Sequence, residues 1–382
     1  MKTIKDVLSD GFWIMPSTPQ FIEGGEIPYI TSKNIKIGNI DFSNVQYISK
    51  EDFEEISKNR PIKVNDMLIS MIGTLGNIAT VKETDGSFYG QNMYLLRLNS
   101  DVIDRDYFYH FFNSDVVKRH IESKKNKSTQ GYLKANHIEE IAIPVPSMEE
   151  QKEIASHFEA INSLIEARKE QLTKLDQLVK SRFIEMFGDY DLSHTNEEWK
   201  PISEIGKVVG GATPKTNIEE YWDGEYRWIT PAELSADSGY IYDSVRKLTK
   251  AGVDSCSLQE MPIDTVILSS RAPIGKVAIA GNTFYCNQGF KNIICSKDIL
   301  PRYLYTVLLL NTEYLNLLGR GATFKEISKS IVENIKIPVP PIELQNEFAT
   351  FVEQTDKLKL EVKKSLEKLE TLKKSLMQQY FG

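Results

Sequence analysis

The feature that most constrains this chain is a long segment that occurs twice. Residues 141–188 and residues 335–382 align without a gap at an offset of 194, and 20 of the 48 aligned positions are identical. A gap-free repeat of this length means that the molecule is built twice. Any proposed fold must therefore consist of two copies of one architecture.

Each copy begins with Ile-x-Ile-Pro-Val-Pro, a run that predicts a short extended segment because its prolines cannot lie inside a helix. In the first copy Glu149 and Glu150 follow, where negative charge suits the N-terminus of a helix. After these prolines, no Pro or Gly interrupts either copy before its final glycine. The pattern predicts two long helices within 147–190 and 341–382, each of about 38 residues and about 57 Å.

Apolar residues recur along both predicted helices in alternating steps of four and three for about five heptads, which is typical of a coiled coil. The predicted seam consists of Ile154, Phe158, Ile161, Ile165, Leu172, Leu175, Val179, Leu358, Val362, Leu366, Leu369 and Leu376. Antiparallel pairing is favoured, because it lets two similar halves face each other about a pseudo-two-fold axis. The alternative is that each helix packs separately on its own domain. Arg168 and Arg182 also fall on the seam, and the pattern gives them no role.

The two remaining segments, 1–146 and 191–340, show the same order of short strand-like runs followed by a helix. In the first segment the expected strands are 27–31, 66–70 and 91–98, and residues 73–79 form a glycine turn into a further strand. The matching runs in the second segment are 226–230, 264–269 and 273–278, and the expected helices are 106–121 and 301–317. The predicted fold class is therefore α+β. Two similar globules are each followed by a long helix, and the two helices form an antiparallel coiled coil.

Composition adds three limits to this architecture. The longest apolar runs are too short to span a bilayer, and the polar residues 1–10 predict no secretory leader. Three cysteines without a CxxC spacing argue against a disulfide framework and a zinc site, and they fit a cytoplasmic protein. A net charge of −7 counts against a general nucleic-acid binder, so any site for a polyanion must be local.

The sequence offers little for catalysis. It contains no phosphate-binding GxxxxGK[ST] loop, no GxSxG nucleophile motif and no HExxH metal motif, and its five histidines are scattered. We therefore expect no catalytic, cofactor-binding or metal-binding residues in this chain.

Two local windows are basic. Residues 265–297 contain no Asp or Glu but include Arg271, Lys276 and Lys291, and residues 118–134 hold a single acid, Glu122, among many lysines. Arg and Lys neutralise phosphates, while Arg, Asn and Gln can pair with base edges. The windows are compatible with a site-specific DNA reader, although a solvated loop with chance clustering of charge is the alternative for each.

The whole chain resembles the specificity subunit of a Type I restriction–modification system. The resemblance is carried by IPVPSMEEQKEIA and IPVPPIELQNEFA before the helices, and by 221–224, 228–230, 270–276 (SRAPIGK) and 287–291 (NQGFK) in the second globule. The first globule matches through Gly24-Gly25, 27–31 and Gly73…Gly76, and it has no RAPxG equivalent.

This resemblance implies that each globule reads one half of a bipartite, asymmetric site on double-stranded DNA. The helix pair would set the spacing and dock two methyltransferase subunits, which would bind S-adenosylmethionine; nuclease (restriction) subunits can join. The chain itself would hold no cofactor and would not be catalytic. The expected DNA-binding residues are Lys33, Asn34, Gln91, Asn92, Lys124, Lys125, Lys127, Gln130, Tyr132 and Lys134 in the first globule, and Lys215, Arg271, Lys276, Gln288, Lys291, Arg320, Thr323 and Lys325 in the second.

Two other classes of function stay open from the sequence. One is a coiled-coil adaptor whose globules bind a ligand other than DNA. The other is a nuclease or methyltransferase whose site carries no known motif. Salt-dependent DNA binding argues against the first class, and assays of the pure chain with DNA, Mg²⁺ and S-adenosylmethionine test the second.

Overall fold

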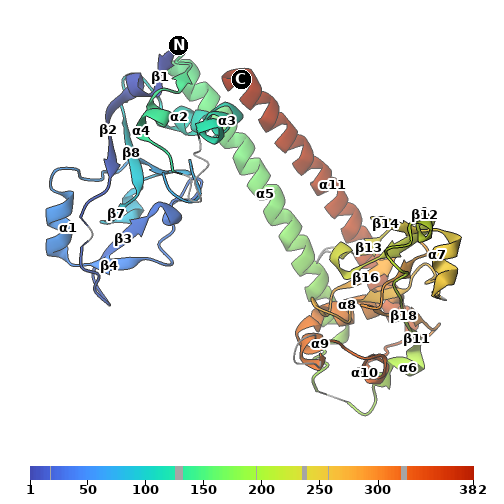
Figure 1. The fold of residues 1–382 in the computed structure, drawn as a ribbon. Coiled ribbons are helices and arrows are strands. Elements are labelled where there is room, and N and C mark those ends of the chain that lie inside the picture. Colours follow the sequence, from blue (N-terminus) through green and yellow to red (C-terminus); the bar gives the residue numbers. More distant parts are fainter. Residues whose placement is uncertain (18, 125–131, 195, 235–238, 257, 320–324) are drawn as a thin grey trace. The chain divides into compact units, whose positions relative to one another are not determined.

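A computed structural model of the chain describes residues 1–17, 19–124, 132–194, 196–234, 239–256, 258–319 and 325–382. Two units are distinguished: unit 1 comprises residues 1–169 and 363–382, and unit 2 comprises residues 170–362. Each unit thus contains one α+β globule and part of each long helix (Figure 1). No helix among the described residues is long and apolar enough to cross a membrane.

Unit 1 contains a four-stranded sheet in the order β2-β8-β5-β6, a three-stranded sheet in the order β4-β3-β7, and a short pair, β1 with β9. The strands are β1 (Lys2–Thr3), β2 (Leu8–Ile14), β3 (Ile27–Thr31), β4 (Gln46–Ile48), β5 (Met67–Ser70), β6 (Ile78–Thr80), β7 (Tyr89–Gln91), β8 (Met93–Leu98) and β9 (Ala142–Ile143). The helices are α1 (Lys50–Ser57), α2 (Arg105–Phe112), α3 (Asp115–Lys124), α4 (Ala135–Glu139) and the first part of α5 (Met148–Phe187), with 3-10 turns η1 (Ile4–Val7), η2 (Ser32–Asn34) and η3 (Glu83–Asp85).

Unit 2 repeats this plan with a five-stranded sheet in the order β11-β18-β15-β16-β13, a three-stranded sheet β14-β12-β17, and the pair β10 with β19. The strands are β10 (Lys200–Pro201), β11 (Gly206–Gly210), β12 (Trp222–Ile229), β13 (Tyr240–Ile241), β14 (Arg246–Leu248), β15 (Val266–Leu268), β16 (Val277–Ala280), β17 (Tyr285–Cys286), β18 (Lys291–Cys295) and β19 (Lys336–Ile337). The helices are α6 (Ile202–Ile205), α7 (Lys250–Ser255), α8 (Pro301–Leu310), α9 (Thr312–Leu318), α10 (Lys329–Asn334), the last part of α5 and the first part of α11 (Ile342–Phe381), with 3-10 turns η4 (Glu219–Tyr221) and η5 (Pro231–Glu233).

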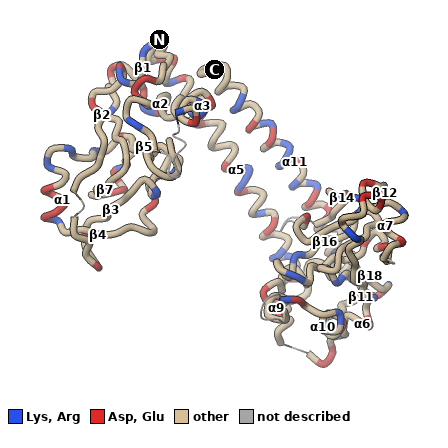
Figure 2. Tube along the Cα trace, viewed as in Figure 1, with Lys and Arg blue, Asp and Glu red and all other residues tan. Residues whose placement is uncertain are grey.

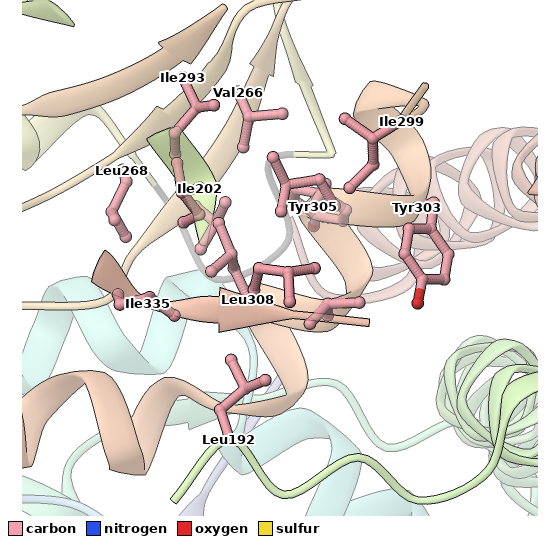
Figure 3. Close-up of a cluster of buried hydrophobic side chains, with 14 of the residues drawn as sticks. Leu192, Ile202, Val266, Leu268, Ile293, Ile299, Tyr303, Tyr305, Leu308 and Ile335 are labelled. Carbon is pink, nitrogen blue, oxygen red and sulfur yellow. The ribbon is translucent and has the colours of Figure 1, made fainter. Parts of the chain in front are cut away.

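An interior strand of each large sheet, β5 in unit 1 and β15 in unit 2, is apolar on both faces, because both of its faces are covered. Side chains alternate along a strand, so Met67 and Ile69 of β5 join the apolar cluster beside the helices while Leu68 joins the cluster beside the three-stranded sheet. In unit 2, Val266 and Leu268 of β15 do the same, and Ile267 faces the other way. Figure 3 shows Val266 and Leu268 converging with side chains of β18 and α8.

A buried glutamine in the first turn of each long helix joins that helix to its globule. The Gln151 side-chain oxygen accepts a hydrogen bond from the Asp104 backbone N–H (2.8 Å), and its amide donates to the carbonyls of Val102 and Pro146. Gln345 accepts from the Leu300 N–H (2.8 Å) and donates to Asp298 and Pro340. The Q of the repeated IPVP…Q motif is thus a structural residue, used identically in both copies.

The same proline segments receive a second matched contact. The Tyr107 hydroxyl donates to the Pro144 carbonyl (2.9 Å), and the Tyr303 hydroxyl donates to the Pro338 carbonyl (3.0 Å). These bonds satisfy carbonyls that no strand partner reaches. The two repeated segments therefore share a set of polar contacts with their globules as well as an apolar seam.

The predicted fold class is confirmed, with one correction to the helices of the globules. The expected helices 106–121 and 301–317 are each two helices, α2 with α3 and α8 with α9. An asparagine ends the first member of each pair: the Asn113 side chain donates to Tyr109 O, and that of Asn311 donates to Val307 O, each at 2.9 Å. Such side-chain bonds to the preceding turn compete with continuation of the helix.

Candidate nucleic-acid interface

Five of the residues expected to bind DNA lie outside the described residues: Lys125, Lys127, Gln130, Arg320 and Thr323. Their role stays a prediction from the sequence alone. The remaining members of both sets have positions that can be compared with the expectation.

In unit 1, several of the expected residues are exposed around the end of α3 and the start of α4. Lys124 ends α3, Lys134 precedes α4, and both are exposed. Tyr132 is 40% exposed and its backbone forms a bridge with Ile72, so its ring is supported on a fixed backbone. Exposed basic groups beside an aromatic ring suit contacts with phosphates and bases.

Lys33 lies in η2 of the same unit and is also exposed. Gln91 ends β7 at a half-buried position, where it pairs with Thr31 of β3. Asn92 follows with a φ of +64°, and its backbone N–H donates to Ile14 O at 2.9 Å. Asparagine adopts a left-handed backbone more readily than most non-glycine residues, so Asn92 suits the turn between β7 and β8.

The expectation for Asn34 needs a correction, because its side chain is occupied within the globule. Its oxygen accepts from the Thr31 N–H (2.9 Å) and hydroxyl, and its amide donates to the carbonyls of Asp41 (2.8 Å) and Asn44 (3.2 Å). Only 9% of the residue is exposed. In unit 2, Glu233 occupies the equivalent position and accepts from Thr230 N–H at 2.8 Å. Asn34 therefore caps η2 and has no donor left for a base.

In unit 2, the acid-free window 265–297 is not acid-free in space. Glu326 reaches it from a segment outside the window and accepts hydrogen bonds from Arg271 Nε (2.9 Å) and Lys291 Nζ (3.1 Å). Burial alone raises the pKa of the Glu326 carboxyl, but the bonds from Lys291 and Arg271 outweigh burial and hold that pKa below its ordinary value. Two of the expected DNA-binding cations therefore share one carboxylate.

The other expected residues of unit 2 divide between internal contacts and the surface. Lys276 Nζ donates to the Leu234 carbonyl (2.6 Å), so this cation is directed into the globule. Gln288 is exposed, and its oxygen accepts from the Thr213 hydroxyl at 2.6 Å, which leaves its amide donors unassigned. Lys215 and Lys325 are exposed. In this structure Lys276 has a structural contact, whereas the surface residues have the exposure that a DNA contact needs.

The two long helices pack against each other in an antiparallel sense within each unit. In unit 1, Phe158 of α5 stacks on Phe381 of α11 with ring centroids 5.8 Å apart. In unit 2, Asp176 pairs with Lys359, and Arg182 pairs with Glu347 at 2.8 Å. Partner numbers fall along α11 as they rise along α5, which is the antiparallel register.

The seam of α5 follows the predicted residues. Ile154 and Phe158 belong to the apolar cluster of unit 1, Ile161 and Ile165 are buried, and Val179 packs into the cluster of unit 2. The Arg182 guanidinium, which had no role in the sequence pattern, lies 5.9 Å from the Phe351 ring centroid and pairs with Glu347 across the helices. An arginine is thus accommodated on the seam through its flat guanidinium group.

The seam of α11 differs from the prediction at one of the named positions. Leu358 is 57% exposed, whereas Lys359 has a side chain only 20% exposed and pairs with Asp176. The buried and half-buried positions that form the seam of α11 are Val352, Thr355, Lys359 and Val362, followed by Leu366, Leu369 and Leu376. Because Lys359 occupies the seam position, a reading of the sequence by hydrophobicity assigns that position to the adjacent Leu358 instead. Figure 2 shows positive and negative residues interleaved along both helices.

Sequence reasoning missed two charged groups that shape unit 2. One is Glu326, which lies 29 residues beyond the end of the basic window at 297. The other is Arg246, whose guanidinium lies 3.5 Å from the Trp222 ring centroid and 5.7 Å from that of Trp228. No spacing rule predicts either contact. Among the described residues, no three His, Cys, Asp or Glu side chains form a group that could hold a metal ion.

The chain matches the family described as the Type I restriction modification DNA specificity domain twice, over residues 1–177 and 196–373. It is 41% identical over 210 residues to the Type I restriction enzyme MjaIX specificity subunit of Methanocaldococcus jannaschii, a match covering 53% of this chain and 48% of that relative. It is 27% identical over 375 residues to the putative MjaX specificity subunit of the same organism, covering 92% of this chain and 85% of that relative.

Solved structures share the fold. The S subunit of a Type-I restriction-modification system from M. genitalium superposes with a TM-score of 0.59 at 16% identity, covering all of this chain and 95% of that one. A chain from a structure of a type I R-M system, described for its complex assembly, gives a TM-score of 0.64 at 18% identity, covering 99% and 96%. The chain belongs to the type I restriction–modification DNA specificity family, and both halves carry the family's domain. It is a DNA specificity subunit of that class.

Proposed function

We propose that the chain selects the DNA target of a type I restriction–modification complex, with each globule reading one half of a bipartite, asymmetric site. The α5–α11 pair sets the distance between the two half-sites and docks two methyltransferase subunits. The family match in both halves of the chain supports this assignment.

The observation that carries the proposal is the contrast between shared internal contacts and unshared surface chemistry. Gln151 and Gln345 make the same buried bonds in the two units. At an equivalent backbone bridge, however, unit 1 presents Ile72 with Tyr132, whereas unit 2 presents Arg271 with Glu326. Two readers of different sequences need a common scaffold and different exposed side chains, which is the combination found here.

The chemistry of the described surface suits DNA. Exposed Lys124 and Lys134 in unit 1 and Lys215 and Lys325 in unit 2 supply cations for phosphates. Tyr132, Gln288 and Arg271 supply an aromatic face, an amide and a guanidinium for base edges. Their exposure supports the interface without assigning bases to residues.

In this proposal the chain is not catalytic and binds no cofactor. S-adenosylmethionine belongs to the methyltransferase subunits, and restriction subunits join when the complex cleaves DNA. The cytoplasmic location expected from cysteine usage stays a prediction.

The test is methylation-sensitive sequencing of DNA from cells that make the complex with its methyltransferase partner. The expected result is one methylated motif made of two different short half-sites separated by a gap of fixed length. A contiguous motif, or methylation that does not depend on this chain, would contradict the proposal.

The spacing role has its own test. Asp176 pairs with Lys359, so deleting residues 170–176 together with 359–365 removes one matched heptad from each helix. Each helix shortens by about 10 Å, which is about three base pairs of DNA. The gap between half-sites should shrink while the bases read stay the same; a changed half-site with an unchanged gap would refute this role.

Two assays separate the alternatives. A coiled-coil adaptor would show no DNA binding, or binding without steep salt dependence, whereas phosphate contacts make affinity fall steeply with salt. An unrecognised enzyme would yield cleaved or methylated DNA when the pure chain is incubated with DNA, Mg²⁺ and S-adenosylmethionine. We expect salt-dependent binding by the complex and no product from the chain alone.

A further inference from the structure

Unit 2 contains a charged trio beside the end of β15 and the start of β18: Arg271, Lys291 and Glu326. Glu326 Oε2 accepts from Arg271 Nε at 2.9 Å, and Glu326 Oε1 accepts from Lys291 Nζ at 3.1 Å. Both oxygens of one carboxylate are therefore used, one by each cation.

The backbone that carries the trio is fixed by hydrogen bonds. Arg271 and Glu326 face each other across an antiparallel bridge, and the Ile327 N–H donates to the Ser270 carbonyl at 2.9 Å. On the other side, the Ser270 N–H donates to the Gly289 carbonyl at 2.7 Å, two residues before Lys291. The three side chains consequently start from backbone positions that are set by the fold.

The two cations are not equivalent in exposure. The Lys291 side chain is 13% exposed, and besides Glu326 its amine contacts the Ser270 hydroxyl at 3.3 Å. The Arg271 side chain is 45% exposed and meets Glu326 through Nε, the nitrogen nearest its stem. A guanidinium held through Nε keeps the two terminal amino groups, which form the outer fork, for another acceptor.

We propose that Glu326 is a positioning residue that aims the outer fork of Arg271 at a base edge, and that Lys291 balances Glu326 rather than touching DNA. The inference rests on the proposed DNA-reading function and assigns it a residue. The chemical partner is guanine, because its O6 and N7 are adjacent acceptors that match two parallel N–H donors.

Charge favours a base over a phosphate as the partner. The trio carries two positive charges and one negative charge, so its net attraction for a phosphate is that of a single cation. A phosphate contact needs positive charge but little direction, whereas a base contact needs a fork with a fixed direction. An arginine whose Nε is fixed by a carboxylate has a set direction, and the pair that it forms with that carboxylate carries no net charge.

Unit 1 has no such group at the equivalent bridge, where Ile72 faces Tyr132. The charged trio belongs to unit 2, so removing it should change the base preference in one half-site only. This restriction makes the proposal testable within the intact complex, because the other half-site serves as an internal control.

The experiment measures the methylated motif in cells that make the complex with wild-type chain, Arg271→Lys, Glu326→Gln or the charge-preserving double variant Glu326→Gln with Lys291→Gln. Arg271→Lys keeps the charge and removes the fork. We expect all three variants to relax one base position in one half-site, with about a ten- to hundredfold loss of discrimination. The second half-site and the gap should not change. Lys329→Gln, which changes one exposed helical charge near the trio, is the matched control and should leave the motif intact.

A second readout separates positioning from a general structural effect. DNA binding by the double-variant complex, measured against salt, should keep the wild-type slope because the net charge is the same, whereas a lost phosphate contact reduces the slope by about one. Unchanged base preference with uniformly weaker binding would overturn the proposal. If the wild-type complex gives no bipartite motif, the proposed function fails as well; a wild-type motif left unaltered by all three variants defeats this inference alone.

Discussion

Gln151 of unit 1 and Gln345 of unit 2 hold the start of a long helix against its globule with the same three bonds. The backbone bridge between residues 72 and 132 has its counterpart between 271 and 326, but its side chains have nothing in common. The comparison shows which interactions are required by the scaffold and which are free to vary. Buried polar contacts that position helices recur in both units, whereas the charges and rings that face solvent do not.

The largest expected effect concerns the aromatic residues where the helices meet each unit's core. Phe158 in unit 1 and Phe183 in unit 2 are 0% and 1% exposed. Replacing either with Ala should destabilise its own unit by about 3–5 kcal/mol, because a large buried side chain is lost and a cavity stays. Hydrogen exchange resolved by segment should show the loss in the substituted unit first. Equal loss of protection in both units would show that they unfold together.

The glutamine contacts should contribute equally to the unfolding free energies of the two units. Gln151→Ala and Gln345→Ala each leave a partly buried backbone N–H, of Asp104 or of Leu300, without its acceptor. We expect each to cost about 1–3 kcal/mol by chemical denaturation. Lys152→Ala and Asn346→Ala, at the neighbouring exposed positions, are the matched controls and should stay near wild type. A large difference between the two glutamine variants would mean that the repeat is not energetically symmetrical.

Low pH should lower the stability of unit 1 through His110, which has no counterpart in unit 2. Burial, followed by the charge of Lys373, lowers the pKa of His110 to about 4, against opposing effects of Asp106 and Asp104. Unit 2 has Thr306 at the equivalent position, counted from the matched Tyr107 and Tyr303. Neutral His110 stabilises unit 1 fully above the unfolded pKa of about 6.5, and this contribution is lost as the pH falls towards 4.

The expected size is up to about 3 kcal/mol at pH 4, measured as a fall in the unfolding free energy of unit 1. His110→Phe keeps a ring beside Phe158, whose centroid lies 5.0 Å away, and should remove that part of the pH dependence. Thr306→Val in unit 2 is the control and should leave the pH dependence of the stability of unit 1 unchanged. If His110→Phe retains the full acid sensitivity, another group is responsible.

The smallest effect is expected at the polar position of the seam. Lys359 of unit 2 corresponds to Ile165 of unit 1, and its side chain is 20% exposed beside Asp176. Lys359→Ile should change the stability of unit 2 by no more than about 1 kcal/mol, because the lost ion pair is offset by added apolar burial. Leu358→Ala, at the neighbouring exposed position, provides the comparison. A loss of several kcal/mol in Lys359→Ile would show that the ion pair is essential to helix pairing.

Sequence reasoning succeeded where periodicity alone determines structure. The repeat gave two helices, and α11 runs over residues 342–381 as the uninterrupted pattern predicts. It failed where a single polar side chain ends a helix or takes a seam position against the hydrophobic pattern around it. Asn113 and Asn311 end helices inside patterns that continue, and Lys359 holds a seam position that hydrophobicity assigns to Leu358.

The site was harder to predict than the fold for a related reason. A window free of acids along the chain is a one-dimensional property, and Glu326 enters it only through the backbone bridge to Arg271. Asn34 looked like a base reader because asparagine can pair with adenine, but the 3-10 turn it caps uses all of its bonds. Side-chain type suggests what a residue can bind, and only the fold shows whether its donors are free.

The most direct test of the account compares the two bridge positions in the intact complex by methylation-sensitive sequencing. Tyr132→Ala alters unit 1 and Arg271→Ala alters unit 2, at equivalent places in the fold. The account predicts that each variant relaxes bases in one half-site, that the two variants affect opposite half-sites, and that the gap stays constant. Changes in both half-sites from either variant, or a changed gap, would contradict the claim that each unit reads its own half of the target.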